Sequence, residues 1–314
     1  LSVSPPGPLS CSRAWGGREF THRPWRLSYN DPLLPTRIGI VMVVGLAGIT
    51  LEGRYKVIRP IARGALATVY LAFDIHGTPY ALKVFPRGFE GRADREWKVG
   101  QQLKHPHINP VLARLSVPHD GGEHPAVLLA FAPGIRLSEW RRDNPARILG
   151  VFKHLLEALA HMHGQNLVHR DVKPDNLVVD GTGEARLVDF DLSGPLGERF
   201  SQKVRLGTIA YIAPEQIRGR SPTPASDMYS AGILLYWAIA GELPFVGEPV
   251  EVMNAHLKLP PPPLVAAPET GLTVTAELQG FLSRLICKDV AERYQNALEA
   301  LRDFEAMHAS LIPR

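Results

Sequence analysis

The sequence predicts an α+β protein in which a β-rich N-terminal half precedes an α-helical half. Three observations support this fold class. The segment YKVIRPIARGALATVYLAF indicates two strands around a turn of small residues. TPYALKVF and AVLLAF indicate further strands, and after Leu137 apolar residues recur at helical spacing. The change falls near residues 132–134, so we expect two lobes that meet there.

Composition and charge exclude several classes of protein. Of the 314 residues, 45% are hydrophobic and 21% charged, so the chain can bury a large core. Residues 1–41 carry +3 of the formal net charge of +4, which leaves the remaining chain nearly neutral. A nearly neutral body argues against nucleic-acid binding. The two cysteines, Cys11 and Cys287, form no disulfide framework, so we expect a reducing compartment, the cytoplasm.

The N-terminal segment differs from the rest of the chain. Residues 1–37 are rich in Pro, Ser, Gly and Arg and have no helical or strand period. The next fourteen residues, 38–51, are uncharged, but a membrane helix needs about 20 such residues. We therefore expect no membrane span, a disordered or non-native extension over residues 1–41, and an apolar lead-in over residues 42–53. Met42 precedes the first well-patterned segment, which favours a translation start there.

The helical half begins with a long amphipathic segment. ILGVFKHLLEALAHMH places six apolar residues on one helical face, namely Ile148, Val151, Phe152, Leu155, Leu159 and Met162. SDMYSAGILLYWAIAG is apolar at nearly every position, so we expect its helix at the centre of the lobe. AELQGFLSRLICK and NALEALRDFEAMH are amphipathic, and a more polar helix is predicted earlier, near residues 92–104.

The segment VHRDVKPDNLVV carries the strongest chemical signal. It leads into a short strand, a turn (DGTGEA) and a second strand that ends at Asp189, which together indicate a hairpin. A hairpin brings the residue that enters the first strand, Asn176, beside Asp189. An amide oxygen and a carboxylate suit Mg²⁺ that also binds phosphate oxygens. Asp171 would face the same spot as a proton acceptor, and Lys173 would place a cation against a transferring phosphate.

These residues resemble the eukaryotic-type (Hanks-type) serine/threonine protein kinases, in a pattern close to bacterial members, over residues 54–306. The family's H-R-D-x-K-x-x-N loop is matched at every position. The resemblance implies that Asp171 orients the substrate hydroxyl and accepts its proton, that Lys173 contacts the γ-phosphate, and that Asn176 and Asp189 hold Mg²⁺. By itself, the Asp-x-Asp of DFD would more simply be a solvated or turn-capping pair.

The resemblance extends to residues expected to bind ATP. Lys83 in YALKVF would grip the α- and β-phosphates and pair with Glu96, with Glu90 and Asp94 as weaker alternatives. The loop G-x-G-x-x-G-x-V is matched poorly, because ARGALATV keeps only its middle glycine; the four positions are Ala62, Gly64, Ala67 and Val69. Added Cβ atoms limit the approach of backbone amides to phosphates, so we expect a stiffer cover over ATP.

The segment AVLLAFAPG aligns with the family's hinge between lobes. The resemblance implies that Leu129 is the gatekeeper, and that the carbonyl of Ala130 and the amide of Ala132 hydrogen-bond adenine. The adenine ring would lie between three apolar side chains: Val69, Ala81 and Val178.

The segment GTIAYIAPE ends the family's activation segment. The resemblance implies that Thr208 bonds the catalytic Asp and Lys, and that Glu215 forms a buried pair with Arg293. Asp227 would hydrogen-bond the catalytic-loop backbone, cap its own helix, or both. Ser201 is the candidate autophosphorylation site, with Arg170, Lys203 and Arg205 as the cations that would receive its phosphate.

Two further expectations concern single residues. Asp191 stands where the family has glycine, and we expect it to act on backbone conformation rather than as a third metal ligand. Phe190 is expected to pack inward near Gly100. The histidines show no metal-ligand spacing, and three of them, His154, His161 and His163, are expected on a helix surface.

The interpretation is a two-lobed serine/threonine protein kinase that uses ATP and Mg²⁺. Its domain would span residues 54–308, with an N-lobe over 54–131, a hinge over 130–134, a C-lobe over 135–308 and a tail over 309–314. We expect protein substrates, self-association for autophosphorylation, and neither nucleic-acid nor membrane partners. One alternative is a pseudokinase, a binding module without turnover. The other, a small-molecule phosphotransferase of related fold, is less favoured because such enzymes lack the APE segment and the lysine two residues after the catalytic aspartate.

Overall fold

The computed structural model describes residues 45–64, 66–198 and 209–311. Several sequence-based expectations fall outside these ranges: the extension over residues 1–41 and the start at Met42, and the residues Ser201, Lys203, Arg205 and Thr208. Within the described ranges, no helix is long and apolar enough to cross a bilayer.

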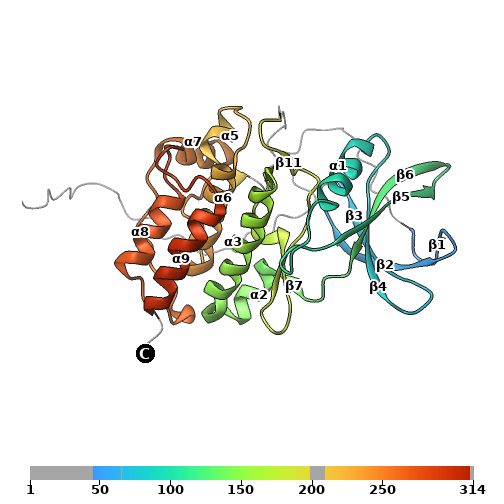
Figure 1. Ribbon diagram of the computed structural model, residues 1–314, viewed down its shortest axis with the longest axis horizontal. Helices are drawn as coiled ribbons and strands as arrows, with labels where there is room; N and C mark the ends of the chain where they lie inside the picture. Colours follow the sequence, from blue (N-terminus) through green and yellow to red (C-terminus); the bar gives the residue numbers. More distant parts are fainter. Residues whose placement is uncertain (1–44, 65, 199–208, 312–314) are drawn as a thin grey trace, which may run out of the picture. The chain divides into compact units, whose positions relative to one another are not determined.

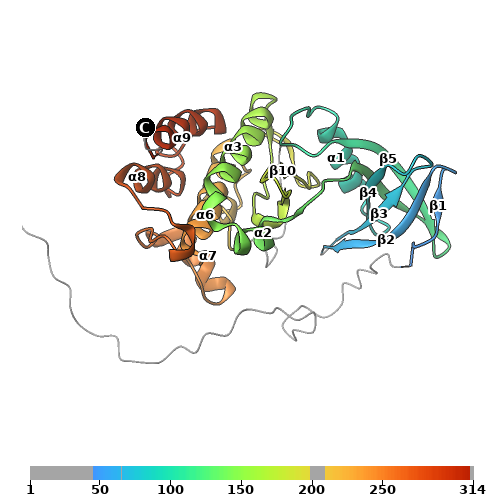
Figure 2. The ribbon, with the colours of Figure 1, turned by 90° about the horizontal axis from the view of Figure 1, so that it is seen from below.

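The N-terminal lobe is an antiparallel six-stranded sheet with one helix, α1 (Figure 1). The strand order is β1-β2-β3-β4-β6-β5, and β1 pairs with β2 at one edge (Figure 2). Helix α1 packs against β5 and β6. The elements are β1 (Thr50–Leu51), β2 (Tyr55–Arg63), β3 (Thr68–Phe73), β4 (Pro79–Val84), α1 (Glu90–Gly100), β5 (Val111–His119) and β6 (Gly122–Ala130).

Alternation along the strands gives this sheet two different faces. One face joins an apolar cluster that includes Tyr70 and Leu82, and the expected lead-in contributes Leu46 and Leu51 to it. The other face carries Ala81 and joins the main core, which continues into the helical lobe. The face shared with that core is therefore the one on which a site between sheet and helices can form.

The C-terminal lobe is mainly helical. Helix α3 packs against α6 and α9, and α8 packs against α6 and α9 (Figure 1). Helix α6 is buried almost throughout, as its continuous apolar sequence predicts. The helices are α2 (Leu137–Asp143), α3 (Ile148–Gly164), α5 (Pro214–Ile217), α6 (Pro224–Ala240), α7 (Pro249–Lys258), α8 (Ala276–Leu285) and α9 (Ala297–Leu311).

Short strands also lie in the C-terminal lobe, before and between its helices along the chain. They form a three-stranded sheet in the order β10-β9-β7 and a two-stranded pair of β11 with β8. The strands are β7 (Ile135–Arg136), β8 (Leu167–Val168), β9 (Leu177–Val179), β10 (Ala185–Leu187) and β11 (Gly194–Pro195). The predicted hairpin is β9–β10, in which Leu177 lies opposite Leu187.

Two boundaries differ from the sequence-based expectation. Helix α1 covers residues 90–100 instead of 92–104, and α9 continues to Leu311. Helix α1 ends at Gly100, where its backbone lies close to Val111 of β5. A Cβ on Gly100 would lie 2.2 Å from a methyl group of Val111. Phe190 is fully buried, as expected, and packs edge-on against His169, with ring centroids 5.8 Å apart.

Candidate active site

The loop between β8 and β9 holds Asp171 in a network of its own residues. Lys173 Nζ donates to Asp171 Oδ2 at 2.6 Å, and Asn176 Nδ2 donates to the same oxygen at 3.1 Å. Asn176 Nδ2 also donates to the backbone carbonyl of Asp171 at 2.8 Å. Because both bonds use the amide nitrogen, the amide oxygen of Asn176 is the atom suited to ligate a cation.

The β9–β10 hairpin sets Asn176 next to the residue that precedes Asp189. The N–H of Val188 donates to the carbonyl of Asn176 at 2.9 Å. Asp189 itself has a φ of 69°, and Arg170 in the catalytic loop has a φ of 71°. Left-handed angles at residues other than glycine cost about 1–3 kcal/mol each and cluster at functional sites. The backbone strain at this site therefore lies at Asp189 and Arg170.

Asp227, near the start of α6, supports the strained loop. Its two carboxylate oxygens accept the backbone N–H groups of His169 and Arg170, each at 2.8 Å. His163 Nδ1 accepts the N–H of Ala297 at 3.0 Å, so its Nε2 carries the proton and donates to Asp227, also at 3.0 Å. Asp227 thus contacts the loop backbone as expected.

Lys83 on β4 joins two carboxylates from different elements. Its Nζ lies 2.8 Å from Glu96 Oε2 on α1 and 2.6 Å from Asp189 Oδ1. The side chains of Lys83 and Glu96 are buried, whereas that of Asp189 is 36% exposed. The expected partner, Glu96, is the one that pairs. Of the alternatives, Asp94 pairs with Arg114, and Glu90 accepts the N–H of Gly88.

The three charges have different environments, and their pKa values shift accordingly. Burial opposes the charged form of Lys83, but Asp189 and Glu96 outweigh burial and raise its pKa. Burial also opposes ionisation of Asp189, yet the Lys83 ammonium holds the pKa of Asp189 well below its usual range. For Glu96 burial prevails over Lys83 and raises the pKa to about 7, with Asp189 and Asp191 adding repulsion.

Asp191 takes part in an ion pair that the sequence analysis missed. Its Oδ2 lies 3.0 Å from Arg92 Nη1 on α1, and its side chain is buried. Asp191 is not among the described residues with positive φ, so it does not need the backbone freedom of the glycine that it replaces. No motif in the sequence links these two residues, which are 99 positions apart.

The residues expected to surround a nucleotide line the inner face of the sheet. Across the paired strands, Ala81 lies opposite Leu129, and Val69 lies opposite Lys83. Ala81 and Leu129 are buried with Ala67, and Val69 packs against the same cluster. Val178 lies on β9 in a different sheet and is half-buried.

The residues expected to cover the phosphates and to bind adenine make contacts within the protein. The N–H of Gly64 donates to the carbonyl of Ala67 at 2.9 Å, which closes the β2–β3 turn tightly, and Ala62 lies opposite Val69. The carbonyl of Ala130 accepts Asn109 Nδ2 at 3.0 Å, so one of its two lone pairs is used within the protein. Ala132, the expected adenine donor, is half-buried.

The predicted pair of Glu215 with Arg293 is present and fully buried. Arg293 Nη1 and Nη2 donate to Glu215 Oε1 and Oε2 at 2.9 and 3.2 Å, and Ser226 Oγ donates to Oε1 at 2.7 Å. Burial opposes ionisation of Glu215, but Arg293 and Ser226 lower its pKa overall. This pair links α5 to the segment that precedes α9.

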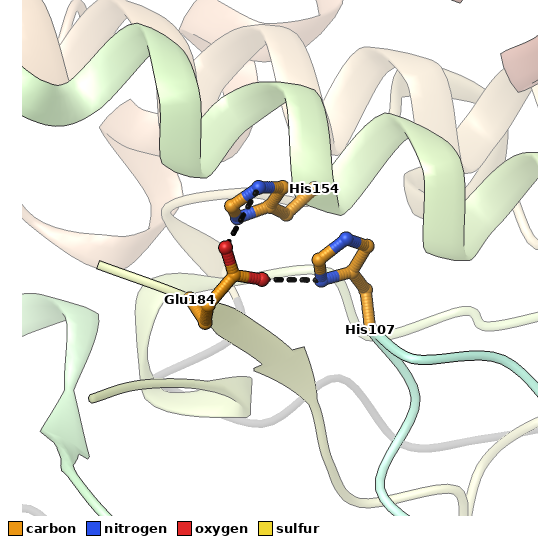
Figure 3. A group of neighbouring side chains, drawn as sticks. All are labelled: His107, His154 and Glu184. Carbon is orange, nitrogen blue, oxygen red and sulfur yellow. Dashed lines mark ion pairs between the residues drawn. The ribbon is translucent and has the colours of Figure 1, made fainter. Parts of the chain in front are cut away.

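The expectation that the histidines of α3 lie on the helix surface is wrong for His163, whereas His154 and His161 are half-buried. His163 is buried against Asp227, as described above. His154 stacks on His107 with ring centroids 4.0 Å apart, and Glu184 lies 3.7 and 3.9 Å from their nitrogens (Figure 3). The rings are within 13° of parallel, so their in-plane lone pairs do not converge on one metal ion. His107 and Glu184, which lie outside α3, cover the surface around His154. The sequence of the helix alone does not reveal these contacts.

Comparisons with known proteins agree with this geometry. Residues 55–303 match the model of the protein kinase domain. The chain is 30% identical over 277 residues to serine/threonine-protein kinase PrkC of Bacillus subtilis, which covers 83% of this chain and 41% of that protein. It is 31% identical over 273 residues to serine/threonine-protein kinase PknL of Mycobacterium tuberculosis, covering 83% and 67%. A probable serine/threonine-protein kinase of Streptomyces coelicolor is 32% identical over 273 residues, covering 82% and 40%.

The sheet, the helical lobe and the lysine-centred site between them define a two-lobed fold of the protein-kinase type. The chain belongs to the protein kinase family, among relatives that are bacterial serine/threonine kinases. It spans less than half the length of PrkC and of the Streptomyces protein.

Proposed function

We propose that this chain transfers the γ-phosphoryl group of ATP to serine or threonine hydroxyls of protein substrates. The observation that carries the proposal is the junction at Lys83, which joins Glu96 of α1 to Asp189 at 2.8 and 2.6 Å. The junction links the sheet, helix α1 and the end of the hairpin through one ammonium group. In this family, activity requires the lysine–glutamate pair to be formed.

Asp171 is the proposed proton acceptor. Lys173 and Asn176 fix its carboxylate through contacts of 2.6 and 3.1 Å, which orients it without a contribution from substrate. A fixed carboxylate can hold a substrate hydroxyl and accept its proton at Oδ as the hydroxyl oxygen attacks the γ-phosphorus. The bond from that phosphorus to the β–γ bridging oxygen would break, and ADP would leave. Lys173 would also supply positive charge beside the transferred group.

Asn176 and Asp189 are the proposed Mg²⁺ ligands. The amide oxygen of Asn176 and the carboxylate of Asp189 are hard oxygen donors, and Asp189 stays ionised because Lys83 lowers its pKa. Bound Mg²⁺ would neutralise phosphate charge. The donor set therefore fits the cation.

The nucleotide would lie under the β2–β3 turn. Ala62, Gly64 and Ala67 would cover the phosphates, and Lys83 would bind them. The adenine would contact Val69, Ala81, Leu129 and Val178, with the Ala130 carbonyl and the Ala132 amide as its hydrogen-bond partners. The remaining lone pair of Ala130 is sufficient for one such bond.

Three finer points also belong to the proposal. Thr208 would bond Asp171 and Lys173, autophosphorylation would proceed through self-association, and the chain would work in the cytoplasm. The last point is supported by the cysteine content, with Cys287 as a free thiol.

The test is a phosphate-transfer assay on a generic protein substrate with labelled ATP. Asp171→Asn should retain ATP binding and lower transfer by about 10²-fold or more, because it removes the proton acceptor. The matched control is Asp175→Asn, an exposed carboxylate of the same loop that pairs with Arg136 at 3.4 Å. The control should transfer phosphate at nearly the wild-type rate. Equal rates in wild type and Asp171→Asn would refute the assignment.

A further inference from the structure

Helix α1 is attached to the segment after Asp189 by two arginines. Arg92 lies three residues before Arg95 and four residues before Glu96 on this helix, so the two arginines come from neighbouring turns. Arg92 Nη1 lies 3.0 Å from Asp191 Oδ2. Arg95 Nη1 donates to both carboxylate oxygens of Glu198, at 3.0 and 2.7 Å.

Glu198 also binds an arginine of the catalytic loop. Arg170 Nη1 donates to Glu198 Oε2 at 2.9 Å, and Arg170 Nη2 donates to the carbonyl of Pro195 at 2.8 Å. Arg95 directly precedes Glu96, and Arg170 directly precedes Asp171. One carboxylate therefore connects the chain neighbours of the lysine partner and of the proposed proton acceptor.

The packing around Gly194 shows that this junction is tight. A Cβ at Gly194 would lie 2.5 Å from Glu198 Oε2, 2.8 Å from Arg95 Nη1 and 2.9 Å from Arg170 Nη1. Any other residue would push at least one of the three charged groups aside. The two arginines lower the pKa of Glu198, so it is ionised at neutral pH.

We propose that Asp191 and Glu198 are positioning residues that hold α1 where Glu96 meets Lys83. The inference rests on the proposed function for its kinetic consequence. Neither residue contacts the reacting atoms, and an arginine of α1 links each of them to that helix. The N–H of Asp191 also donates to Asp189 Oδ1 at 3.4 Å. The Glu198 carboxylate already supplies negative charge to Arg170, so the site forms without a phosphate on the following segment.

The Asp191 contact is tested by a double-mutant cycle of Arg92→Ala and Asp191→Asn. Each single variant should raise the KM for ATP and lower kcat/KM about tenfold, and the double variant should be no worse than either single variant. Hydrogen exchange of residues 90–100 should become faster in all three. The matched control is Asp94→Asn, which breaks a 2.8 Å pair of the same helix with Arg114 on β5. The control should change kcat/KM less than twofold.

The Glu198 contact is tested by Glu198→Gln and by Gly194→Ala, which displaces the same groups sterically. Both should lower kcat/KM about tenfold and speed exchange in α1. Wild-type enzyme treated with phosphatase, and shown by mass spectrometry to carry no phosphate, should keep at least half its activity. Activity that depends on phosphate, or α1 exchange unchanged in every variant, would overturn the inference. If wild type transfers no phosphate, the proposed function fails, whereas the exchange measurement still tests the positioning.

Discussion

Two buried ion pairs, one in each lobe, have opposite electrostatic outcomes. Glu215 is saturated by donors, with two bonds from Arg293 and one from Ser226, and its pKa is lowered. Glu96 has Lys83 as its partner, and within the described residues it accepts no hydrogen bond beyond that ion pair. Its pKa is raised to about 7.

The difference follows from how each cation is shared. Arg293 also donates to the carbonyls of Ala225 and Cys287, which are neutral groups, so its charge serves one carboxylate. Lys83 divides its charge between Glu96 and Asp189. A buried carboxylate with several donors keeps its charge, whereas a buried carboxylate that shares its cation with another carboxylate takes up a proton more readily. The first arrangement suits a brace between helices, and the second suits the proposed role of Lys83 in binding phosphates.

The largest expected effect breaks the saturated pair. Arg293→Met should lower the free energy of unfolding by about 3–5 kcal/mol, because it leaves the Glu215 carboxylate buried without its cation. The double variant Arg293→Met with Glu215→Gln should recover part of this loss. Chemical denaturation measures both.

The control for this change is Arg284→Ala, which removes a more exposed arginine that pairs with Glu299 and Asp303. Its cost should be about 0–1 kcal/mol. Similar losses in Arg293→Met and Arg284→Ala would mean that burial does not distinguish these pairs.

The second effect separates activity from stability at the divided cation. Lys83→Met should lower kcat/KM by about 10²-fold or more, because it removes the charge proposed to bind phosphate. It should destabilise the fold less than Arg293→Met does, because Glu96 can take up a proton at little cost. Parallel rate and denaturation measurements check both parts. A loss of stability as large as that of Arg293→Met would show that the Lys83 pair is also a brace.

The elements and the main site follow from local patterns in the sequence. The loop from His169 to Asn176 and the hairpin that ends at Asp189 depend on spacings within about twenty residues, and short-range spacing determines hairpin geometry. The pairs of Lys83 with Glu96 and Glu215 with Arg293 join distant residues, and they were predicted through the family resemblance. Both are confirmed.

The contacts that were missed join distant residues for which no motif exists. Arg92 and Asp191 are 99 positions apart, and nothing in either segment marks the other as its partner. His163 was expected at a helix surface because the apolar stripe of α3 was assigned to other residues, but α6 and α9 cover a second face. Burial on a second face depends on how helices assemble, which a single helical period does not specify.

The smallest expected effect is a pH dependence that sharpens the contrast between the two glutamates. Glu96 must be ionised to pair with Lys83, so kcat/KM for ATP should fall as pH decreases through about 7. In Glu96→Gln this fall should disappear, and activity should stay low throughout. A wild-type profile that remains flat between pH 6 and 8 would contradict the raised pKa.

Stability should respond to pH in the opposite direction at the two sites. A carboxyl with a raised pKa binds its proton more tightly in the folded state, so the contribution of Glu96 to stability falls as pH rises from its ordinary value of 4.5 towards about 7. Glu215 has a lowered pKa, so its contribution is present above 4.5 and is lost as pH falls through the lowered value.

Denaturation of wild type, Glu96→Gln and Glu215→Gln at acidic and neutral pH measures both contributions. As pH rises, the free energy of unfolding of wild type should fall relative to that of Glu96→Gln. It should rise relative to that of Glu215→Gln. If both differences in unfolding free energy change in the same direction with pH, the two pairs do not differ in the way their cations are shared.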